Sequence, residues 1–218
     1  MALGNEFPVI TTGNLYTAID TYASTISTQP PINTPSNPNG ALNPAGASFL
    51  LSQGSLEGPT VAYAGKGFGA PLIVRYVRYN STANPNLLAY AAPVYWTDET
   101  YTTVSGVFSE GNPAATGNLN SLAGILLPNY TSLGLTAAAA ATALNGNWCF
   151  IVTCGWVPNV SVPASTAIGD ALVGTTGNFT FSRVASGTAP TSRFIAVAQT
   201  AISANNTADV LVNTDITF

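Results

Sequence analysis

Short apolar runs alternate with turn residues through most of the chain, from about residue 48 to its end. The runs follow one another at spacings of roughly 8 to 12 residues, with Gly, Pro, Asn and Asp between them, which is typical of an all-β sandwich or barrel. We therefore predict a fold of short antiparallel strands. They are expected at residues 48–52, 60–64, 70–79, 87–96, 100–108, 122–127, 147–157, 161–164, 170–174, 178–185, 193–201 and 208–218.

Two of these strands show how side chains would be distributed between faces. In NFTFS, residues 178–182, Phe179 and Phe181 alternate with polar residues, so on a strand they would share one face. The odd offset between Cys149 and Cys154 places the two thiols on opposite faces, which disfavours a local disulfide. We expect two buried structural thiols, because Cys is among the most buried residue types.

One segment departs from the strand pattern. TAAAAATALNG, residues 136–146, has high helix propensity and ends in Asn-Gly, a common helix stop. We expect a short Ala-rich helix of about two to three turns there. The chain shows no repeat at a fixed period, which disfavours a propeller, a solenoid or a repetitive fibre.

The first part of the chain is predicted to be an extended N-terminal arm or linker, residues 1–46, leaving residues 47–218 as the β domain. Residues 29–46 (QPPINTPSNPNGALNPAG) are rich in Pro, Asn and Gly, which indicates an extended surface loop or a chain draped on a partner. Residues 13–28 have apolar side chains at helical spacing, which fits a short amphipathic helix or a docking arm. Its candidate anchors are Leu15, Ile19, Tyr22 and Ile26.

Charge is sparse, with five Lys and Arg, nine Asp and Glu, and a net charge of -4 in 218 residues. A folded monomer of 22.3 kDa exposes roughly 9,400 Å², which leaves about one charge per 670 Å². An ordinary domain contains about 25% charged residues, against 6% here. Much of such a surface is expected to contact protein rather than water, which favours a component of an assembly.

The missing residue types argue against several classes of function. The absence of His removes the commonest general base and the commonest ligand of zinc, copper and iron, so we expect no catalytic triad of the usual kind and no cofactor. One Lys and four Arg cannot line a phosphate backbone, and the same shortage argues against an anionic membrane surface. No apolar run approaches the ~20 residues of a membrane-spanning helix. No secretory signal is recognisable, so we expect synthesis in a cytoplasm or earlier processing.

Three features resemble sites, and each has a simpler structural interpretation. GKGFG, residues 65–69, resembles a phosphate loop but lacks its Lys-Ser/Thr ending, so a flexible loop is favoured. Asp98 and Glu99 are adjacent and Glu110 lies a strand away, so two of these carboxylates across a hairpin would be a pair for glycoside hydrolysis. More simply, Asp98 and Glu99 belong to a solvated turn between strands. The three indoles, at Trp96, Trp148 and Trp156, would stack on sugars only if two or more were exposed and coplanar. Core packing is favoured.

A series of short segments resembles the capsid decoration (cement) proteins of tailed bacteriophages in its order and cadence. The resemblance extends from about residue 73 to the end of the chain. The segments are Arg75–Tyr79, Pro93–Trp96, Leu122–Leu127, Phe150–Gly155, Ala167–Val173, Ile195–Ala198 and Asp209–Val212. Where the family pattern has Ile-Gly-Val-Ala, this chain has Ala196 in place of the Gly, and residues 1–60 have no clear counterpart.

The resemblance implies a small β protein that is not an enzyme and has no catalytic residues to carry over. It implies a homotrimer that binds the major capsid protein on the outer surface of the virion and stabilises an icosahedral head. Two alternatives stay open: a carbohydrate-binding head-fibre or adhesin module with glycans as partners, and a shell-forming capsid or tail-tube subunit.

Overall fold

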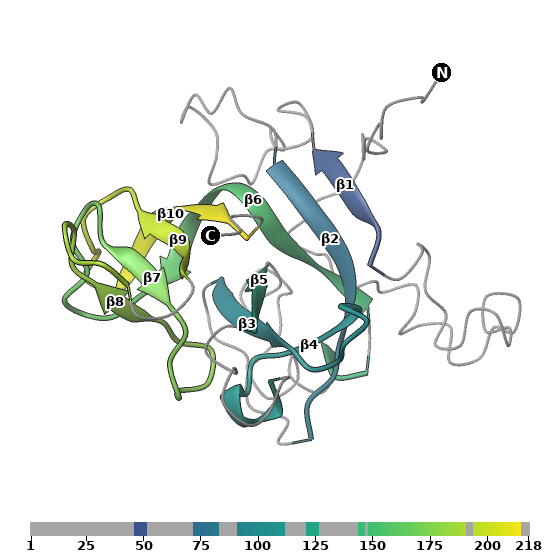
Figure 1. Ribbon diagram of the computed structural model, residues 1–218. Coiled ribbons are helices and arrows are strands. Elements are labelled where there is room, and N and C mark those ends of the chain that lie inside the picture. The colour runs from purple at the N-terminus through teal and green to yellow at the C-terminus, as the bar shows by residue number, and fades with distance from the viewer. Residues whose placement is uncertain are drawn as a thin grey trace, which may run out of the picture.

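The computed structural model describes residues 46–51, 72–82, 91–111, 121–126, 144–146, 148–190 and 194–214 (Figure 1). Within these ranges the chain forms ten strands joined in one continuous sheet, which confirms the all-β prediction. In chain order the strands are β1 (Ser48–Leu51), β2 (Leu72–Tyr79), β3 (Ala92–Trp96), β4 (Thr103–Ser105), β5 (Leu122–Leu126), β6 (Trp148–Ser161), β7 (Ala171–Val173), β8 (Ser182–Val184), β9 (Phe194–Ala198) and β10 (Thr207–Asn213). A 3-10 turn, η3 (Phe108–Glu110), follows β4.

Five strands close into a barrel. Their order is β2-β4-β3-β5-β6, and β6 pairs back onto β2, so that the sheet closes on itself. The β2–β4 pair is parallel, whereas the other pairs of these strands are antiparallel, as predicted. β1 lies along the first half of β2. Closure leaves these five strands without a free edge over their paired lengths, which favours a rigid unit.

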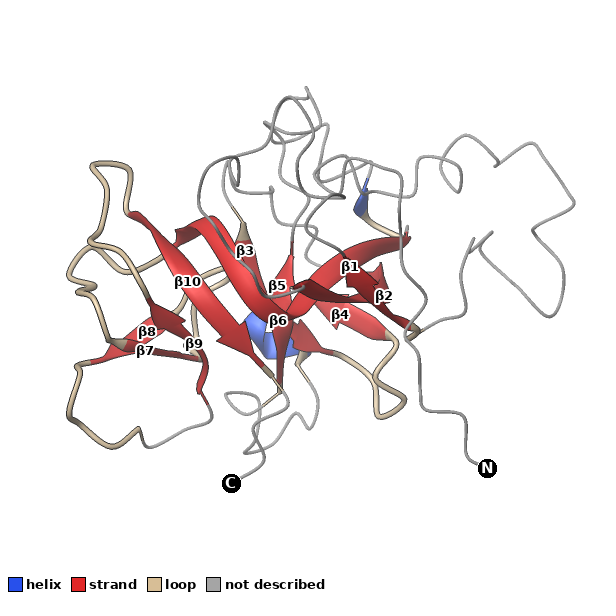
Figure 2. Cartoon of the chain, turned by 90° about the horizontal axis from the view of Figure 1, so that it is seen from above, coloured by secondary structure: helices blue, strands red, loops and turns tan. Residues whose placement is uncertain are grey.

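The long strand β6 connects the barrel to a second group of strands (Figures 1 and 2). Its first half pairs with β2, and its second half pairs with β10. From there the sheet continues in the order β6-β10-β9-β7-β8, which we call the outer sheet. The outer sheet is antiparallel throughout its described pairs.

The course of β6 corrects the prediction of two separate strands at residues 147–157 and 161–164. One strand runs from Trp148 to Ser161, and its register against β10 shifts at Pro158 and Asn159. Two residues of β6 oppose one residue of β10 there, and Asn159 has a left-handed φ of +51°. A bulge tolerates a proline, which lacks the N–H that a regular ladder requires, so Pro158 does not end the strand.

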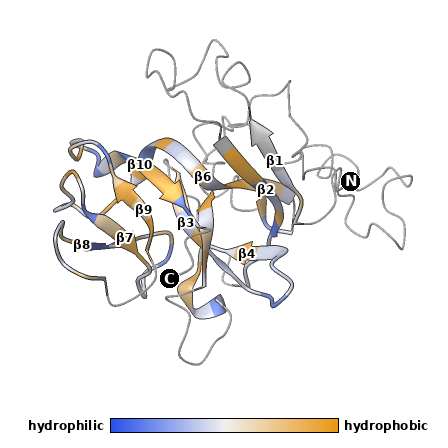
Figure 3. Cartoon of the chain, turned by 45° about the horizontal axis from the view of Figure 1, so that its top comes forward, coloured by the Kyte–Doolittle hydropathy of each residue, from blue (hydrophilic) through white to orange (hydrophobic). Residues whose placement is uncertain are grey.

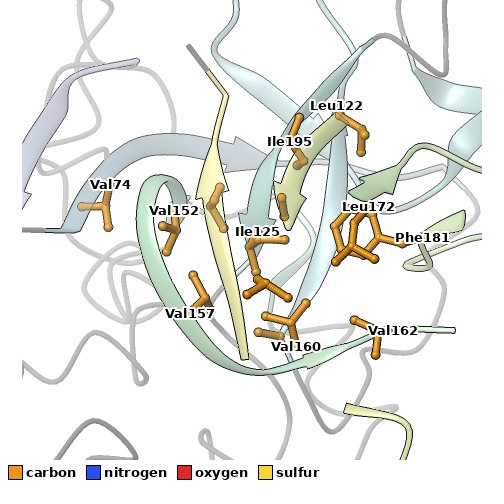
Figure 4. Close-up of a cluster of buried hydrophobic side chains, with 14 of the residues drawn as sticks. Val74, Leu122, Ile125, Val152, Val157, Val160, Val162, Leu172, Phe181 and Ile195 are labelled. Carbon is orange, nitrogen blue, oxygen red and sulfur yellow. The ribbon is translucent and has the colours of Figure 1, made fainter. Parts of the chain in front are cut away.

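The described part of the chain contains two hydrophobic cores. The barrel core takes side chains from all five barrel strands together with Leu144 and Phe179. The second core lies between β2, β3, β5 and β6 on one side and β7, β9 and β10 on the other (Figure 4). Figure 3 shows the apolar residues that run along β7, β9 and β10. The barrel and the outer sheet are therefore packed together through an extended apolar interface.

Phe179 and Phe181 do not share a face, so the prediction of one strand at residues 178–185 is wrong in its first half. Phe179 has a left-handed φ of +51° and packs in the barrel core, whereas Phe181 belongs to the second core. The strand itself begins only at Ser182. A turn at Phe179 breaks the alternation on which the prediction depended.

Two turns that lead into strands of the outer sheet have residues with left-handed backbone. Gly169-Asp170 leads into β7, and Gly169 has the positive φ of +87° that glycine adopts without steric cost. Asn205-Asn206 precedes β10, and Asn206 has a φ of +56°. The predicted arm at residues 1–46 lies outside the described residues apart from Gly46. The strand at residues 60–64 and all but the last three residues of the Ala-rich helix also lie outside them.

Candidate interaction surface

Asp98 organises the turn between β3 and β4. Its Oδ1 accepts the amides of Thr102 and Thr103 at 3.0 and 3.3 Å, and its Oδ2 accepts the hydroxyls of Thr100 and Thr102 at 2.9 and 2.7 Å. Burial alone would raise the pKa of Asp98, but these hydrogen bonds outweigh it and hold the pKa below its usual value. The carboxylate therefore holds the turn between β3 and β4 in place. This agrees with the interpretation of Asp98 as a turn residue.

Glu110 is engaged in a different place. Its Oε2 accepts the hydroxyl of Ser105 at 2.5 Å, and its Oε1 accepts the amide of Thr82 at 2.7 Å and the hydroxyl of the same residue. These contacts connect η3 to β4 and to the segment after β2. Asp98 and Glu110 thus each anchor their own stretch of chain, which is a structural role for both members of the carboxylate pair considered from the sequence.

Two of the three Trp residues are core residues. Trp96 is only 7% exposed, with the Arg75 guanidinium 5.0 Å from its ring centroid and Tyr101 in an edge-to-face contact at 5.6 Å. Trp148 is 6% exposed and stacks on Tyr76 at 5.1 Å. A platform of two exposed, coplanar indoles is therefore not formed by Trp96, Trp148 and Trp156.

The two thiols are not disulfide-bonded, as their offset predicted. Cys149 is fully buried in the barrel core, and burial raises the pKa of its thiol above the usual value. Cys154 is only half-buried, at the point where β6 leaves β2 and pairs with β10. The expectation of burial is therefore met fully by Cys149 and partly by Cys154.

The carboxylate of Asp170 connects two turns of the outer sheet, and we call this set of contacts the Asp170 latch. Its Oδ2 accepts the Ala167 amide at 2.8 Å and Nη1 of Arg183 at 2.9 Å, and its Oδ1 accepts the Ser186 amide at 2.9 Å. The Arg183 Nε in turn donates to the Ser165 hydroxyl at 2.9 Å. Burial alone would raise the pKa of Asp170, but these contacts together lower it. The latch fixes the turns that precede β7 and follow β8.

An apolar row crosses the outward face of the outer sheet. Five side chains lie directly opposite one another on adjacent strands, one from each strand between β6 and β8. In order across the sheet they are Trp156, Leu211, Val197, Ala171 and Val184, which we call the outer row. Their strand neighbours Val210, Ala196 and Leu172 belong to the second core, so the row faces the other way.

The outer row is accessible along its whole length. Leu211 is 45% exposed, and the other four side chains are half-buried, with Trp156 also packed against the second core. The other large apolar side chains that are exposed in the described chain, Tyr101 and Ile168, lie in turns. The outer row is therefore a continuous surface, whereas those two are isolated residues.

The charges of the described residues are divided unequally between the two regions. The barrel and its connections contain Arg75, Arg78, Asp98, Glu99 and Glu110. The outer sheet and its turns contain Asp170 and Arg183, which neutralise each other, and Asp209, which is 6% exposed and accepts the Asn159 amide at 3.3 Å. The outward face of the outer sheet consequently presents no exposed charge within the described chain.

Sequence analysis missed the outer row, although one signal was present. In ADVLVN, residues 208–213, Leu211 stands between two valines, so the strand is apolar on both faces rather than on one. The partners of Leu211 on β9 and β6 depend on strand register, which a single sequence does not give. The predicted anchors Leu15, Ile19, Tyr22 and Ile26, and the loop at residues 65–69, lie outside the described residues.

Comparisons with models of protein families, with curated proteins and with solved structures gave no match for this chain. In the part of the chain that the structure describes, no three His, Cys, Asp or Glu side chains gather where they could hold a metal ion. No helix within the described ranges is long and apolar enough to cross a membrane.

Proposed function

We propose that this chain is a capsid decoration protein that binds the outer surface of an icosahedral phage head as a homotrimer and stabilises the head. Its partners are its own copies and the major capsid protein. The observation that carries the proposal is the outer row, a continuous apolar surface without exposed charge, on a chain in which the carboxylates of Asp98, Glu110 and Asp170 are engaged in structural hydrogen bonds. Such a surface is suited to contact with protein.

The resemblance to decoration proteins supports the proposal from another direction. Three of the segments that carry it lie in or directly before strands of the outer sheet. They are Ala167–Val173, Ile195–Ala198 and Asp209–Val212, which lead into or form β7, β9 and β10. The segments that carry the resemblance therefore include three strands that support the outer row.

Decoration stabilises a shell through many small contacts. Anything that binds the assembled state and not its separated parts shifts the equilibrium toward assembly by mass action. Once one copy of an oligomer is bound to the shell, the other copies are held near their own sites at a high effective concentration. Several contacts that are each weak therefore give tight binding together. A rigid barrel connected to a contact-forming sheet suits this role.

The test uses heads from a virus in which the gene for this chain is deleted. We expect these heads to assemble but to break at a lower temperature than complete heads. Purified protein should bind them and raise the temperature of breakage to that of complete heads. Failure of the protein to bind these heads would overturn the proposal. If no heads formed at all, the chain would instead be a shell-forming subunit.

A glycan array run with the same protein tests the sugar-binding alternative. We expect no glycan signal that depends on Trp156, the one indole of the three that is not a core residue. A glycan signal that is lost in Trp156→Ala, together with unchanged head stability, would contradict decoration and support a carbohydrate-binding module.

A further inference from the structure

We infer that the outer row is the surface through which one copy of this chain contacts a second copy. The inference deepens the proposed function and rests on its homotrimer, because it assigns the contact between copies to particular residues. The contact is centred on Leu211, the most exposed member of the row, with Val197 and Trp156 on either side.

The first argument is the register of the five side chains. Single exposed apolar residues are common on protein surfaces and need no explanation. The outer row is different because each member lies opposite the next on five successive strands. Register of this kind aligns side chains into one ridge, and a ridge can pack against another surface as a unit.

The second argument is charge, which selects an identical partner. Each copy carries a net charge of -4, so two copies repel each other wherever their contact brings charges together. The outer row has no charge of its own, the nearby Asp170 and Arg183 neutralise each other, and Asp209, two residues from Leu211, is only 6% exposed. A strongly charged partner would find no complementary charge here, whereas a second copy is itself poor in charge, at 6% of its residues, and can cover the row with few charges to desolvate.

The third argument is the size of the surface. Five strands about 4.8 Å apart and about five residues long give a face of roughly 19 by 17 Å, or roughly 320 Å². A stable pairwise interface buries about 800 Å² on each partner. One such contact is therefore too small to hold a dimer. In a closed ring of three, each copy makes two contacts, and leaving the ring breaks both.

A closed ring also specifies the kind of contact. Cyclic trimers are held by heterologous contacts, in which one surface of a copy meets a different surface of the next copy. The outer row supplies one of these two surfaces. Because the same row acts in all three contacts, one substitution in the row weakens every contact of the ring.

The experiment measures the mass of the purified full-length protein by sedimentation velocity over a range of concentrations, without any capsid. We expect the wild type to be a trimer, and Leu211→Glu to raise the concentration of half-assembly by about 100-fold, because it buries an unpaired charge. Leu211→Lys should have the same effect although it makes the net charge of the chain less negative. The control is Ile168→Glu, which adds the same charge at a side chain that is 63% exposed in a turn and should leave the mass unchanged.

Three results would overturn the inference. They are a monomeric wild type at high concentration, a trimer that persists in both Leu211 variants, and an equal loss of trimer in Ile168→Glu. Thermal unfolding checks that the variants are folded, since Leu211 lies outside both cores. Failure of the two proposals can be told apart. A trimer that depends on Leu211 but does not bind heads would refute decoration and leave the contact between copies standing. A monomer that coats heads would refute the contact between copies and the homotrimer and leave decoration standing.

Discussion

The barrel and the outer sheet share strand β6 but are stabilised in different ways. The barrel is closed, has a core rich in aromatic residues and contains close backbone contacts such as that of Gly124 with β6. The outer sheet ends at a short edge strand, β8, and its turns are held by the Asp170 latch. One region has its apolar side chains inside, whereas the other also presents an apolar row outside.

This difference shows how a single sheet can serve two purposes. A closed barrel leaves no free strand edges to mediate contacts, so it is suited to rigidity. An open sheet with a second apolar face keeps a surface for association, but the surface must lack charge if identical copies are to meet there. Substitutions in the barrel should therefore reduce stability, and substitutions in the outer row should reduce association.

The largest loss of stability is expected from Phe179→Ala. Phe179 is 2% exposed, stacks on Tyr79 at 6.2 Å and fills the space above Gly106. Its removal leaves a cavity in the barrel core and should lower the free energy of unfolding by about 3 to 5 kcal/mol. Urea unfolding measures the change. A loss below about 1 kcal/mol would contradict the tight packing of the barrel.

The next largest effect is expected from Gly124→Ala. A Cβ at this position would lie 2.4 Å from the Val152 carbonyl oxygen, so β5 and β6 would have to move apart. We expect the free energy of unfolding to fall by about 3 kcal/mol, the upper end of the range for overpacking, because backbone atoms cannot move aside as a flexible side chain can. Gly187→Ala is the matched control. Its Cβ would meet nothing within 4 Å, so it should cost only about 1 to 2 kcal/mol for the positive φ. Equal losses in the two variants would show that the barrel is not the more tightly packed region.

A smaller and pH-dependent effect is expected from Asp170→Asn. At neutral pH the variant should lose about 1 to 3 kcal/mol, because hydrogen bonds to a buried carboxylate are weakened or broken. The pKa of Asp170 is lowered in the folded state, so its contribution is present above the unfolded value of about 3.9 and is lost as pH falls through the folded value. Urea unfolding at pH 7 and at about pH 2 should show a smaller difference between wild type and variant at the lower pH. A difference that is the same at both pH values would exclude the ionised latch.

The smallest expected effect is a difference in the rate at which a reagent labels the two thiols in the folded protein. Cys154 is half-buried at the junction with the outer sheet, whereas Cys149 is buried and its raised pKa keeps it protonated. A thiol reagent should therefore label Cys154 first in the native protein and Cys149 only after unfolding. Mass spectrometry of labelled peptides reads the order. Equal rates at both thiols would mean that the barrel opens as readily as the junction.

The strands were predictable from the sequence where turn residues separate apolar runs, because that spacing is a local property. Each of the ten strands lies in or overlaps a predicted run, from Ser48–Leu51 to Thr207–Asn213. Predictions failed where backbone geometry overrides pattern. Pro158 lies in a bulge rather than at a strand end, and a left-handed Phe179 faces a different core from Phe181.

The candidate surface was less predictable than the fold. It depends on which residues lie opposite each other, and the pairing of Leu211 with Val197 and Trp156 joins segments far apart in the chain. The role of Asp170 was hidden for the same reason, since Arg183 and Ser186 approach it only after β7 and β8 have paired. Sparse charge indicated association but not the face on which it occurs.

The most direct test of the division between a rigid barrel and a contact-forming sheet is hydroxyl-radical footprinting at low and high protein concentration. Leu211 in the outer row and Tyr101 in the β3–β4 turn are similarly exposed in one copy, at 45% and 54%. We predict that oxidation of Leu211 falls as concentration rises, because a second copy covers it, whereas oxidation of Tyr101 stays constant. Oxidation of Leu211 that does not change with concentration, or that falls no more than that of Tyr101, would contradict the account.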